Sequence, residues 1–258
     1  MNTRSQTAQT LALEVRTEFQ KLIRQPGFAL PTLGFPLLFY TLFALTLARQ
    51  GRAGGLGFPT YLLGTYATFG VLSTTLLAVG VGVALERGQG WLQLRRTTPM
   101  PLLTYFAAKG IVSAGFALLV VLGLSALAVG FGGVHLPLWT WLRFVAILTM
   151  GSLPFTALAL AVGYLAGPSS APAVVNLISM PLGFCSGLWL PIEMLPKLLQ
   201  KIAVALPPYH LGQLALAPLA AGRRESPLLS LAVLALFSAL CLGAARFGYL
   251  RDRGRTYG

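Results

Sequence analysis

The longest stretches without a charged residue decide what this chain can fold into. From Phe28 to Ala48 there is no Asp, Glu, Lys or Arg, and five further apolar runs follow. A helix needs about 20 apolar residues to cross the hydrocarbon core of a bilayer. The runs lie at about 28–48, 59–85, 110–132, 143–166, 172–190 and 227–245. Because they are continuous rather than alternating, helices are favoured over a β-barrel. We therefore predict an all-α polytopic membrane protein with six transmembrane helices, which form one transmembrane domain over residues 1–258.

The low share of charged residues agrees with a membrane protein, and the positions of Lys and Arg between the apolar runs account for the positive net charge. Hydrophobic residues make up 55% of the chain and charged residues only 10%, against about 25% charged residues in soluble domains. The net charge of +13 comes from Lys and Arg placed between the apolar runs, where they orient spans rather than bind nucleic acid. With the N-terminus inside, cytoplasmic segments hold twelve Lys and Arg and outer segments hold seven. We predict a multi-pass protein of the cell membrane with both termini in the cytoplasm and no nucleic-acid partner.

The N-terminal segment before the first apolar run has the spacing of an amphipathic helix. Apolar residues recur at Leu11, Val15, Phe19, Leu22 and Ile23, and Arg16, Glu18, Lys21 and Arg24 take the other faces. Pro26–Gly27 ends this pattern. We expect residues 1–27 to form a cytoplasmic helix lying in the membrane interface. The alternative is an ordinary helix packed on the protein.

The segment 188–208, between the fifth and sixth runs, is too apolar for a free loop. Leucines and other apolar residues recur along it, but Pro191 and Pro196 prevent one straight span. We expect a re-entrant helical hairpin on the far side of the membrane, with Lys197 and Lys201 reaching the headgroups. Glu193 would lie near the N-terminus of the following helix, where it would either cap the helix or interact favourably with its dipole. The alternatives are a helix lying flat on the outer leaflet and a solvated linker.

No pattern in the sequence indicates a catalytic or metal centre. The phosphate-binding motif GxxxxGK[ST], the metalloprotease motif HExxH and the nucleophile motif GxSxG do not occur. The interiors of the apolar runs contain no ionisable residue, although proton-coupled and ion-coupled transport usually needs one. We expect no catalytic residue, no metal site and no cofactor bound by this chain.

The fifth run carries the polar and small residues of most interest. Asn176 and Ser179 make either an interhelical hydrogen bond or a contact with cargo in a pathway. Gly183, Ser186 and Gly187 would let a second subunit approach closely, or they pack only within the chain.

Two segments resemble type-2 ABC transporter permeases. The stretch from Glu86 to Pro99 is similar to the cytoplasmic loop of that family: Glu86, Gly90, Leu92, Thr98 and Pro99 match, whereas Trp91 and Gln93 depart from the usual Thr and Glu. The stretch from Ser186 to Pro196, and the following Leu206 to His210, resembles the family's turn into paired re-entrant helices. With six spans and an N-terminal interfacial helix, the resemblance covers nearly the whole chain.

The resemblance implies the membrane subunit of an ATP-driven exporter. Two permease chains, identical or closely related, would pair with two copies of a separate ATPase subunit that binds ATP and Mg. Loop 86–109 would contain the coupling helix, with ATPase-coupling residues Glu86, Arg87, Gly90, Trp91, Leu92, Leu94, Arg95, Arg96 and Pro99. The alternative for this loop is a solvated basic segment that faces anionic lipid.

Segment 188–208 would close the far side of the pathway through Leu188, Trp189, Pro191, Glu193, Leu195 and Pro196. Membrane lipid is a further partner, and an amphiphilic or apolar cargo is favoured because no charged cavity is evident. The alternative function is a self-standing channel or secondary transporter, for which the apolar runs lack the expected charged residues.

Overall fold

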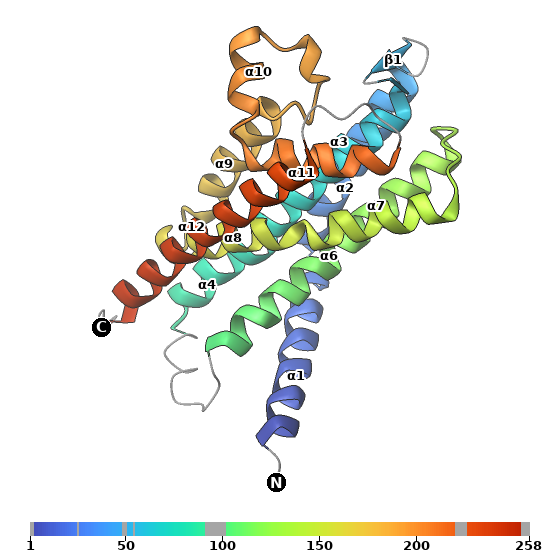
Figure 1. Cartoon of the computed structure of the whole chain (residues 1–258). Coiled ribbons are helices and arrows are strands. Elements are labelled where there is room, and N and C mark those ends of the chain that lie inside the picture. The colour runs from blue at the N-terminus through green and yellow to red at the C-terminus, as the bar shows by residue number, and fades with distance from the viewer. Residues whose placement is uncertain are drawn as a thin grey trace.

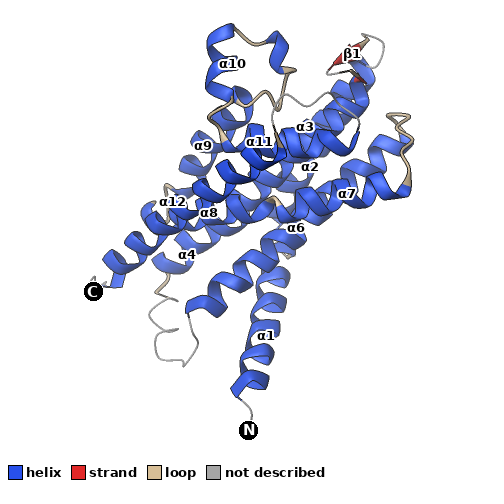
Figure 2. Ribbon diagram, viewed as in Figure 1, coloured by secondary structure: helices blue, strands red, loops and turns tan. Residues whose placement is uncertain are grey.

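The computed structural model describes residues 3–24, 26–47, 51–53, 55–90, 102–219 and 226–253. These residues are mostly helical, as Figure 2 shows. The long helices are α1 (Thr3–Ile23), α2 (Pro26–Leu47), α3 (Phe58–Thr75), α6 (Leu102–Gly130), α7 (Leu138–Met150), α8 (Ser152–Leu165), α9 (Ala171–Cys185) and α12 (Pro227–Arg253). The shorter ones are α4 (Gly82–Gly88), α10 (Lys197–Ala203) and α11 (Pro207–Leu216). A small antiparallel hairpin of β1 (Arg52–Ala53) and β2 (Leu56–Gly57), which the sequence did not predict, precedes α3.

The all-α polytopic class is confirmed. Within the described residues, four segments are long and apolar enough to cross a membrane: Phe58–Gly88, Thr104–Gly130, Leu138–Leu165 and Pro227–Arg251. A fifth arises if the bent pair Lys197–Ala203 and Pro207–Leu219 is counted as one span. The predicted first and fifth spans fall on the shorter apolar segments Thr32–Thr46 and Ala171–Cys185. The count of six therefore stays a prediction.

Two helix boundaries differ from the predicted ones in ways that bear on function. The third span was expected to start at residue 110, but α6 starts at Leu102, so that polar residues before the apolar run join the helix. The fifth was expected to continue to residue 190, but α9 ends at Cys185. The chain turns there because Gly187 has a φ of 70°, a conformation that glycine adopts readily.

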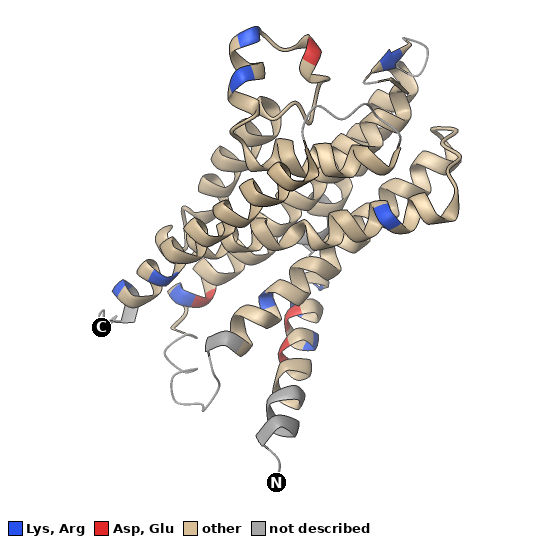
Figure 3. Cartoon of the chain, viewed as in Figure 1, with Lys and Arg blue, Asp and Glu red and all other residues tan. Residues whose placement is uncertain are grey.

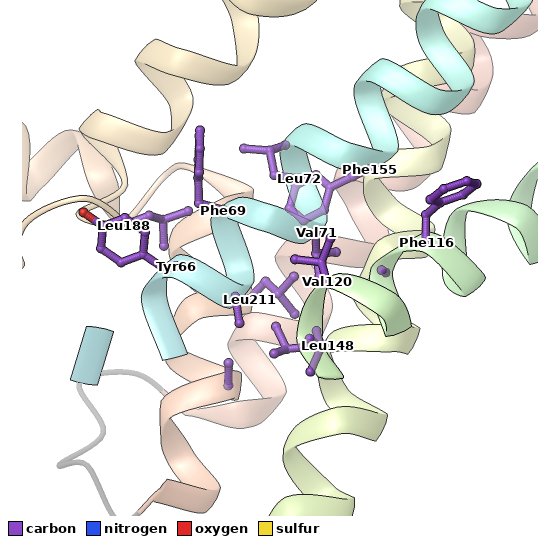
Figure 4. Close-up of a cluster of buried hydrophobic side chains, with 14 of the residues drawn as sticks. Tyr66, Phe69, Val71, Leu72, Phe116, Val120, Leu148, Phe155, Leu188 and Leu211 are labelled. Atoms are coloured by element: carbon purple, nitrogen blue, oxygen red, sulfur yellow. The ribbon is translucent and has the colours of Figure 1, made fainter. Parts of the chain in front are cut away.

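Helix α3 is the centre of the bundle. In the apolar part of the segment Phe58–Gly88, 78% of the residues are buried, against 22% in the apolar part of α12. Figure 4 shows side chains of α3, among them Tyr66, Phe69 and Leu72, in the same cluster as residues from α6, α8 and α11. Helix α12 therefore lies at the edge of the bundle, where lipid meets it.

Span two does not continue as a regular α-helix. A π-helical segment, η1 (Leu76–Val81), joins α3 to α4. It packs closely on α8, because a Cβ atom added to Gly163 would lie 3.0 Å from the Gly80 carbonyl oxygen and one added to Gly80 would lie 3.3 Å from the Ala159 carbonyl oxygen. Single π-helical turns inside α-helices often accompany functional positions. The segment separates the central part of the span from α4, which leads into the predicted coupling loop.

The start of the first helix and the end of the last helix lie at the same end of the bundle. In Figure 1 the start of α1, the end of α4 and the end of α12 share this end, whereas α10 and β1 lie at the other. We call the first the terminal end and the second the far end. Figure 3 shows Lys, Arg, Asp and Glu mainly towards these two ends, as expected when the middle of the bundle faces hydrocarbon.

The far end carries a compact cap formed by η2 (Ile192–Met194), α10 and α11. Ile192, Leu195, Ala203 and Tyr209 form a small core of their own, with Leu199 against it. Helices α10 and α11 meet at 85°. The segment is thus a folded helical pair and not a solvated linker, while its depth in the bilayer stays a prediction.

Of the two roles predicted for Glu193, the helix cap is wrong for α10, and the interaction with a helix dipole stays a prediction. Helix α10 begins after Pro196 and has no side-chain capping bond at its N-terminus. Instead Gln200 Nε2 donates to the Leu195 carbonyl at 2.8 Å and thereby stabilises the turn that precedes α10.

Candidate functional site

A buried cluster of charged side chains joins three helices at the terminal end. Lys109 Nζ on α6 donates to Glu18 Oε2 on α1 at 2.7 Å and to Glu86 Oε1 on α4 at 2.7 Å. Lys21 Nζ donates to the same Glu86 oxygen at 2.9 Å, and the Tyr105 hydroxyl donates to Glu86 Oε2 at 2.8 Å. We call these five residues the ionic cluster. It links the N-terminal helix to both sides of the predicted coupling loop.

Helical spacing brings these side chains together. Glu18 and Lys21 are three residues apart on α1, and Tyr105 and Lys109 are four apart on α6, so each pair shares one face of its helix. The side chain of Lys109 is only 1% exposed and that of Glu86 4% exposed. Lys21, at 42%, is the member that reaches solvent. Helix α1 is thus held on the bundle by ion pairs in addition to apolar contacts such as Phe19 with Phe116.

The cluster balances its charge internally. Two carboxylates face two ammonium groups, which is the condition under which buried charges are tolerated. Burial raises the pKa of the Glu18 carboxyl above its usual value; the attraction of Lys109 opposes this effect and the nearby Glu86 carboxylate adds to it. Lys109 also lies 5.2 Å from the centre of the Tyr105 ring, a cation–π contact.

Sequence reasoning missed this cluster because it placed Lys109 in a loop. With the third span starting at residue 110, Lys109 counted as a topology-setting charge one residue outside the membrane. The signal that could have found it is the helical spacing of Tyr105, Lys109 and Val112, which extends the apolar face of α6 towards the loop.

Arg87, next to Glu86, holds the end of another helix. Its Nη1 donates to the carbonyls of Gly163 at 2.7 Å and Ala166 at 3.1 Å, and its guanidinium lies 5.9 Å from the centre of the Tyr164 ring. These carbonyls belong to the C-terminal turn of α8, where they lack helical donors. Arg87 therefore ties α4 to α8.

The predicted coupling residues are divided by the structure into two groups. Glu86 and Arg87 make their contacts within their own chain, with the ionic cluster and with α8 respectively, and their role in coupling stays a prediction. Gly90 forms a turn with a φ of 73°, and its amide donates to the Arg87 carbonyl at 3.1 Å. The remaining six, Trp91, Leu92, Leu94, Arg95, Arg96 and Pro99, lie outside the described residues.

Replacing Arg87 with Gln should loosen α4 from α8 without unfolding the chain. Each hydrogen bond to a charged group contributes about 1.5–3 kcal/mol, and the shorter, uncharged side chain of Gln cannot replace the two charge-assisted bonds that Arg87 Nη1 makes. We expect a variant that is expressed at normal levels but melts at a lower temperature than the native chain. Thermal unfolding in detergent measures this, with Arg143→Gln, an exposed arginine on α7, as the matched control. Equal loss in both variants would contradict the bridging role.

A second polar group lies in the centre of the bundle. Thr75 Oγ1 and Ser113 Oγ are 3.0 Å apart, and Thr156 Oγ1 donates to Ser113 Oγ at 2.9 Å. These hydroxyls come from α3, α6 and α8 and lie directly before the π-helical segment. They supply no charge, and they hold the three helices together where the regular pattern of span two ends.

The small residues of the predicted fifth span pack within the chain. A Cβ atom on Gly183 would lie 2.6 Å from the Phe69 ring on α3, and one on Gly187 would lie 3.1 Å from Ile192. Ser179 and Ser186 are also buried. Of the two alternatives for Gly183, Ser186 and Gly187, these contacts favour packing inside one chain, and the approach of a second subunit at these residues stays a prediction.

The opposite face of α9 is open. Asn176 is exposed, and so are Leu177 at 74%, Met180 at 40% and Phe184 at 41%. Their spacing of one, three and four residues places them on one side of the helix. An amide among exposed apolar residues is unfavourable against hydrocarbon, so this face is a candidate for contact with another protein chain or with cargo.

The predicted far-side gate is partly buried in its own bundle. Leu188, Pro191 and Leu195 are buried, whereas Glu193 and Pro196 are exposed. Trp189 packs edge-on against Phe69 with ring centres 5.3 Å apart, and it also approaches Phe35 and Phe39 of α2. Trp189 thus joins α2, α3 and the turn after α9.

Comparison with known proteins shows which family this chain belongs to. A family model described as ABC-2 type transporter matches residues 9–219, from α1 to the end of the helical cap. A protein of Bacillus subtilis (strain 168) named "Putative transport permease YvfS" is 26% identical over 195 residues, which cover 76% of this chain and 79% of that protein.

Proposed function

Because the chain belongs to the ABC-2 type transporter family, whose members are the membrane subunits of transporters, we propose that it forms half of the translocation pathway of an ATP-driven exporter. ATP hydrolysis takes place in a separate ATPase subunit, two copies of which serve two membrane subunits. The family match over residues 9–219 is the observation that carries the proposal. The match includes the ionic cluster, the coupling segment and the helical cap.

The ionic cluster supports a coupling role for the segment between α4 and α6. Glu86 lies at the entry to this segment, and Tyr105 and Lys109 lie shortly after its exit, so both ends are fixed to each other. Through Glu18 the same cluster holds α1, and through Arg87 the entry holds α8. A displacement of the segment by an ATPase subunit is thereby passed to three helices. Span two would bend at the π-helical segment η1, which directly precedes α4.

We place the second membrane subunit against the open face of α9 and the adjacent face of α2. Leu38, Leu42 and Leu45 of α2 are exposed at 61%, 52% and 57%, and the aromatic contacts of Trp189 bring α2 near α9. Burial of Asn176 at this contact would satisfy an amide that lipid cannot.

Disulfide cross-linking tests this contact. In a background with Cys185 and Cys241 replaced by Ala, cysteines at the outward positions Leu177, Met180 and Phe184 should give inter-chain adducts in membranes. A cysteine at the buried Ser179 is the control and should give none. If none of the three outward cysteines formed an inter-chain adduct while protein levels were maintained, a dimer through α9 would be contradicted.

The helical cap is proposed to close the far side of the pathway. In the described part of the chain, Ser186 Oγ and Trp189 Nε1 are buried without a hydrogen-bond partner. Buried polar atoms without a hydrogen-bond partner are uncommon in folded proteins. Ser186 and Trp189 lie at the turn that connects α9 to the helical cap. Cargo, water or a rearranged cap would complete their hydrogen bonding. We propose an amphiphilic or apolar cargo, a location in the cell membrane, and both termini in the cytoplasm.

ATP hydrolysis in the purified preparation tests the proposed function. The sequence contains no phosphate-binding motif of its own, so hydrolysis must come from a subunit that accompanies the chain. The tagged chain, isolated in mild detergent from the membranes of its source cell, should hydrolyse Mg-ATP. A homogeneous preparation of the chain that transports without nucleotide would overturn the proposal.

A further inference from the structure

A groove opens on the side of the bundle between α6, α8 and α12. Its volume is about 440 Å³, within the range of about 300–1,000 Å³ typical of ligand sites. The lining residues are Phe106, Ala107, Gly110, Ile111, Ala114, Met150, Leu153, Thr156, Ala157, Leu160, Ser238 and Leu242. Nothing in the coupling, dimer or gate proposals uses this groove.

The groove is lined by three helices, α6, α8 and α12. Helix α8 forms the floor, and α6 presents small residues at helical spacing, Ala107, Gly110 and Ala114, where larger ones would fill the space. A Cβ atom on Gly110 would meet only Leu153, at 3.7 Å. Lining residues at the rim are exposed, Ile111 at 47% and Leu242 at 45%, so the groove is open towards the lipid that surrounds α12.

The interior of the groove offers nothing for a polar ligand. The hydroxyl of Ser238 donates to the Leu234 carbonyl at 2.7 Å. Thr156 Oγ1 lies within hydrogen-bond distance of Ser113 Oγ, at 2.9 Å, and of the Ser152 carbonyl oxygen, at 3.0 Å. The other lining side chains are apolar, so the groove fits a hydrocarbon chain.

The side chain of Arg246 places a positive charge at one end of the groove. Ser238, Leu242 and Arg246 are each four residues apart on α12, so Arg246 continues the lining face about one turn beyond Leu242, roughly 6 Å along the axis. Arg246 is exposed, and α12 runs from there to the terminal end. An acyl chain lying in the groove would thus place its headgroup phosphate near a guanidinium, which binds phosphate in a fork geometry.

We propose that this groove is a binding site for one anionic phospholipid from the leaflet at the terminal end. An acyl chain fills the groove between Gly110 and Leu242, and Arg246 binds the phosphate-containing headgroup. In the proposed orientation this is the cytoplasmic leaflet. Binding requires neither the ATPase nor the orientation, so its test can fail or succeed independently of the proposed function.

Native mass spectrometry of the detergent-purified full chain in equal amounts of dioleoyl phosphatidylglycerol and dioleoyl phosphatidylcholine tests the proposal. The native chain should retain one lipid and prefer the glycerol lipid roughly fivefold, the effect of one basic residue near a membrane surface. Gly110→Leu with Ala114→Leu should abolish retention of both lipids. Arg246→Gln should retain a lipid without the preference.

Matched controls separate this site from general lipid contact. Ala126→Leu, an exposed alanine elsewhere on α6, and Arg251→Gln, an exposed arginine on another face of α12, should behave as the native chain does. Equal retention of the two lipids by the native chain, or unchanged retention in the Gly110→Leu and Ala114→Leu variant, would overturn the proposal. It would also be overturned if that variant converted a dimer to monomers, because the groove would then hold a second copy of the chain.

Discussion

Replacing Lys109 with Met is expected to destabilise the chain by about 3–5 kcal/mol, the usual effect of removing one partner from a buried ion pair. Its ammonium group is the donor that Glu18 and Glu86 share. Without it, two carboxylates remain buried with only the half-exposed Lys21 between them. Helix α1 would lose its hold on α6, and the two ends of the coupling segment would separate.

Thermal unfolding of the detergent-solubilised chain measures this effect. A shift of about 2–4 °C per kcal/mol for a chain of this size predicts a midpoint on the order of 10 °C lower. Lys201→Met, which removes an exposed lysine of α10, is the control and should shift the midpoint little. A Lys109→Met midpoint as close to native as that of the control would contradict the ionic cluster.

A triple variant distinguishes charge from shape. Combining Lys109→Met with Glu18→Gln and Glu86→Gln removes the uncompensated carboxylates and keeps side chains of similar size. Replacement of a whole buried ionic group by uncharged residues is often nearly neutral. The triple variant should therefore recover most of the lost stability. If it is no more stable than Lys109→Met alone, lost packing rather than unpaired charge explains the defect.

The second large effect is expected from Trp91→Asp combined with Leu92→Asp. We propose that these side chains enter a groove of the ATPase subunit, and aromatic residues at the centre of an interface often contribute 2 kcal/mol or more each. A carboxylate in that position would also be buried without a partner. Association with the ATPase should weaken by at least roughly 30-fold, and ATP hydrolysis should no longer drive transport.

Reconstituted vesicles containing both subunits measure this uncoupling, with hydrolysis and cargo movement recorded on the same sample. Trp91→Phe with Leu92→Ile keeps the apolar contact and should retain coupling. Transport at the native level in the Asp variant would refute the coupling role and favour a basic loop that faces lipid.

The apolar runs were sufficient to predict the class of the fold, because a run such as 28–48 has few alternatives to a membrane helix. They were less informative about helix ends. Leu102 to Lys109 looked like a loop because two polar residues and a lysine precede the apolar run, yet tertiary ion pairs make burial of Lys109 favourable. Gly187 ended α9 earlier than hydropathy indicated, because hydropathy carries no information on backbone turns.

The site was harder to predict than the fold because its residues come from distant parts of the sequence. Glu18 lies 91 residues and Glu86 lies 23 residues before Lys109, and no local pattern pairs them. Gly183 illustrates the opposite problem: a small residue on an apolar helix permits close packing, but its sequence does not say whether the neighbour is Phe69 or a second subunit.

The mass of the intact assembly tests the central claim most directly. Isolated in mild detergent together with whatever binds it, the 27.4 kDa chain should be found in a complex of two membrane subunits and two ATPase subunits. The Trp91→Asp and Leu92→Asp variant should yield the membrane subunits without the ATPase. A native chain that is isolated alone, with transport that proceeds without any ATPase subunit, would contradict the account.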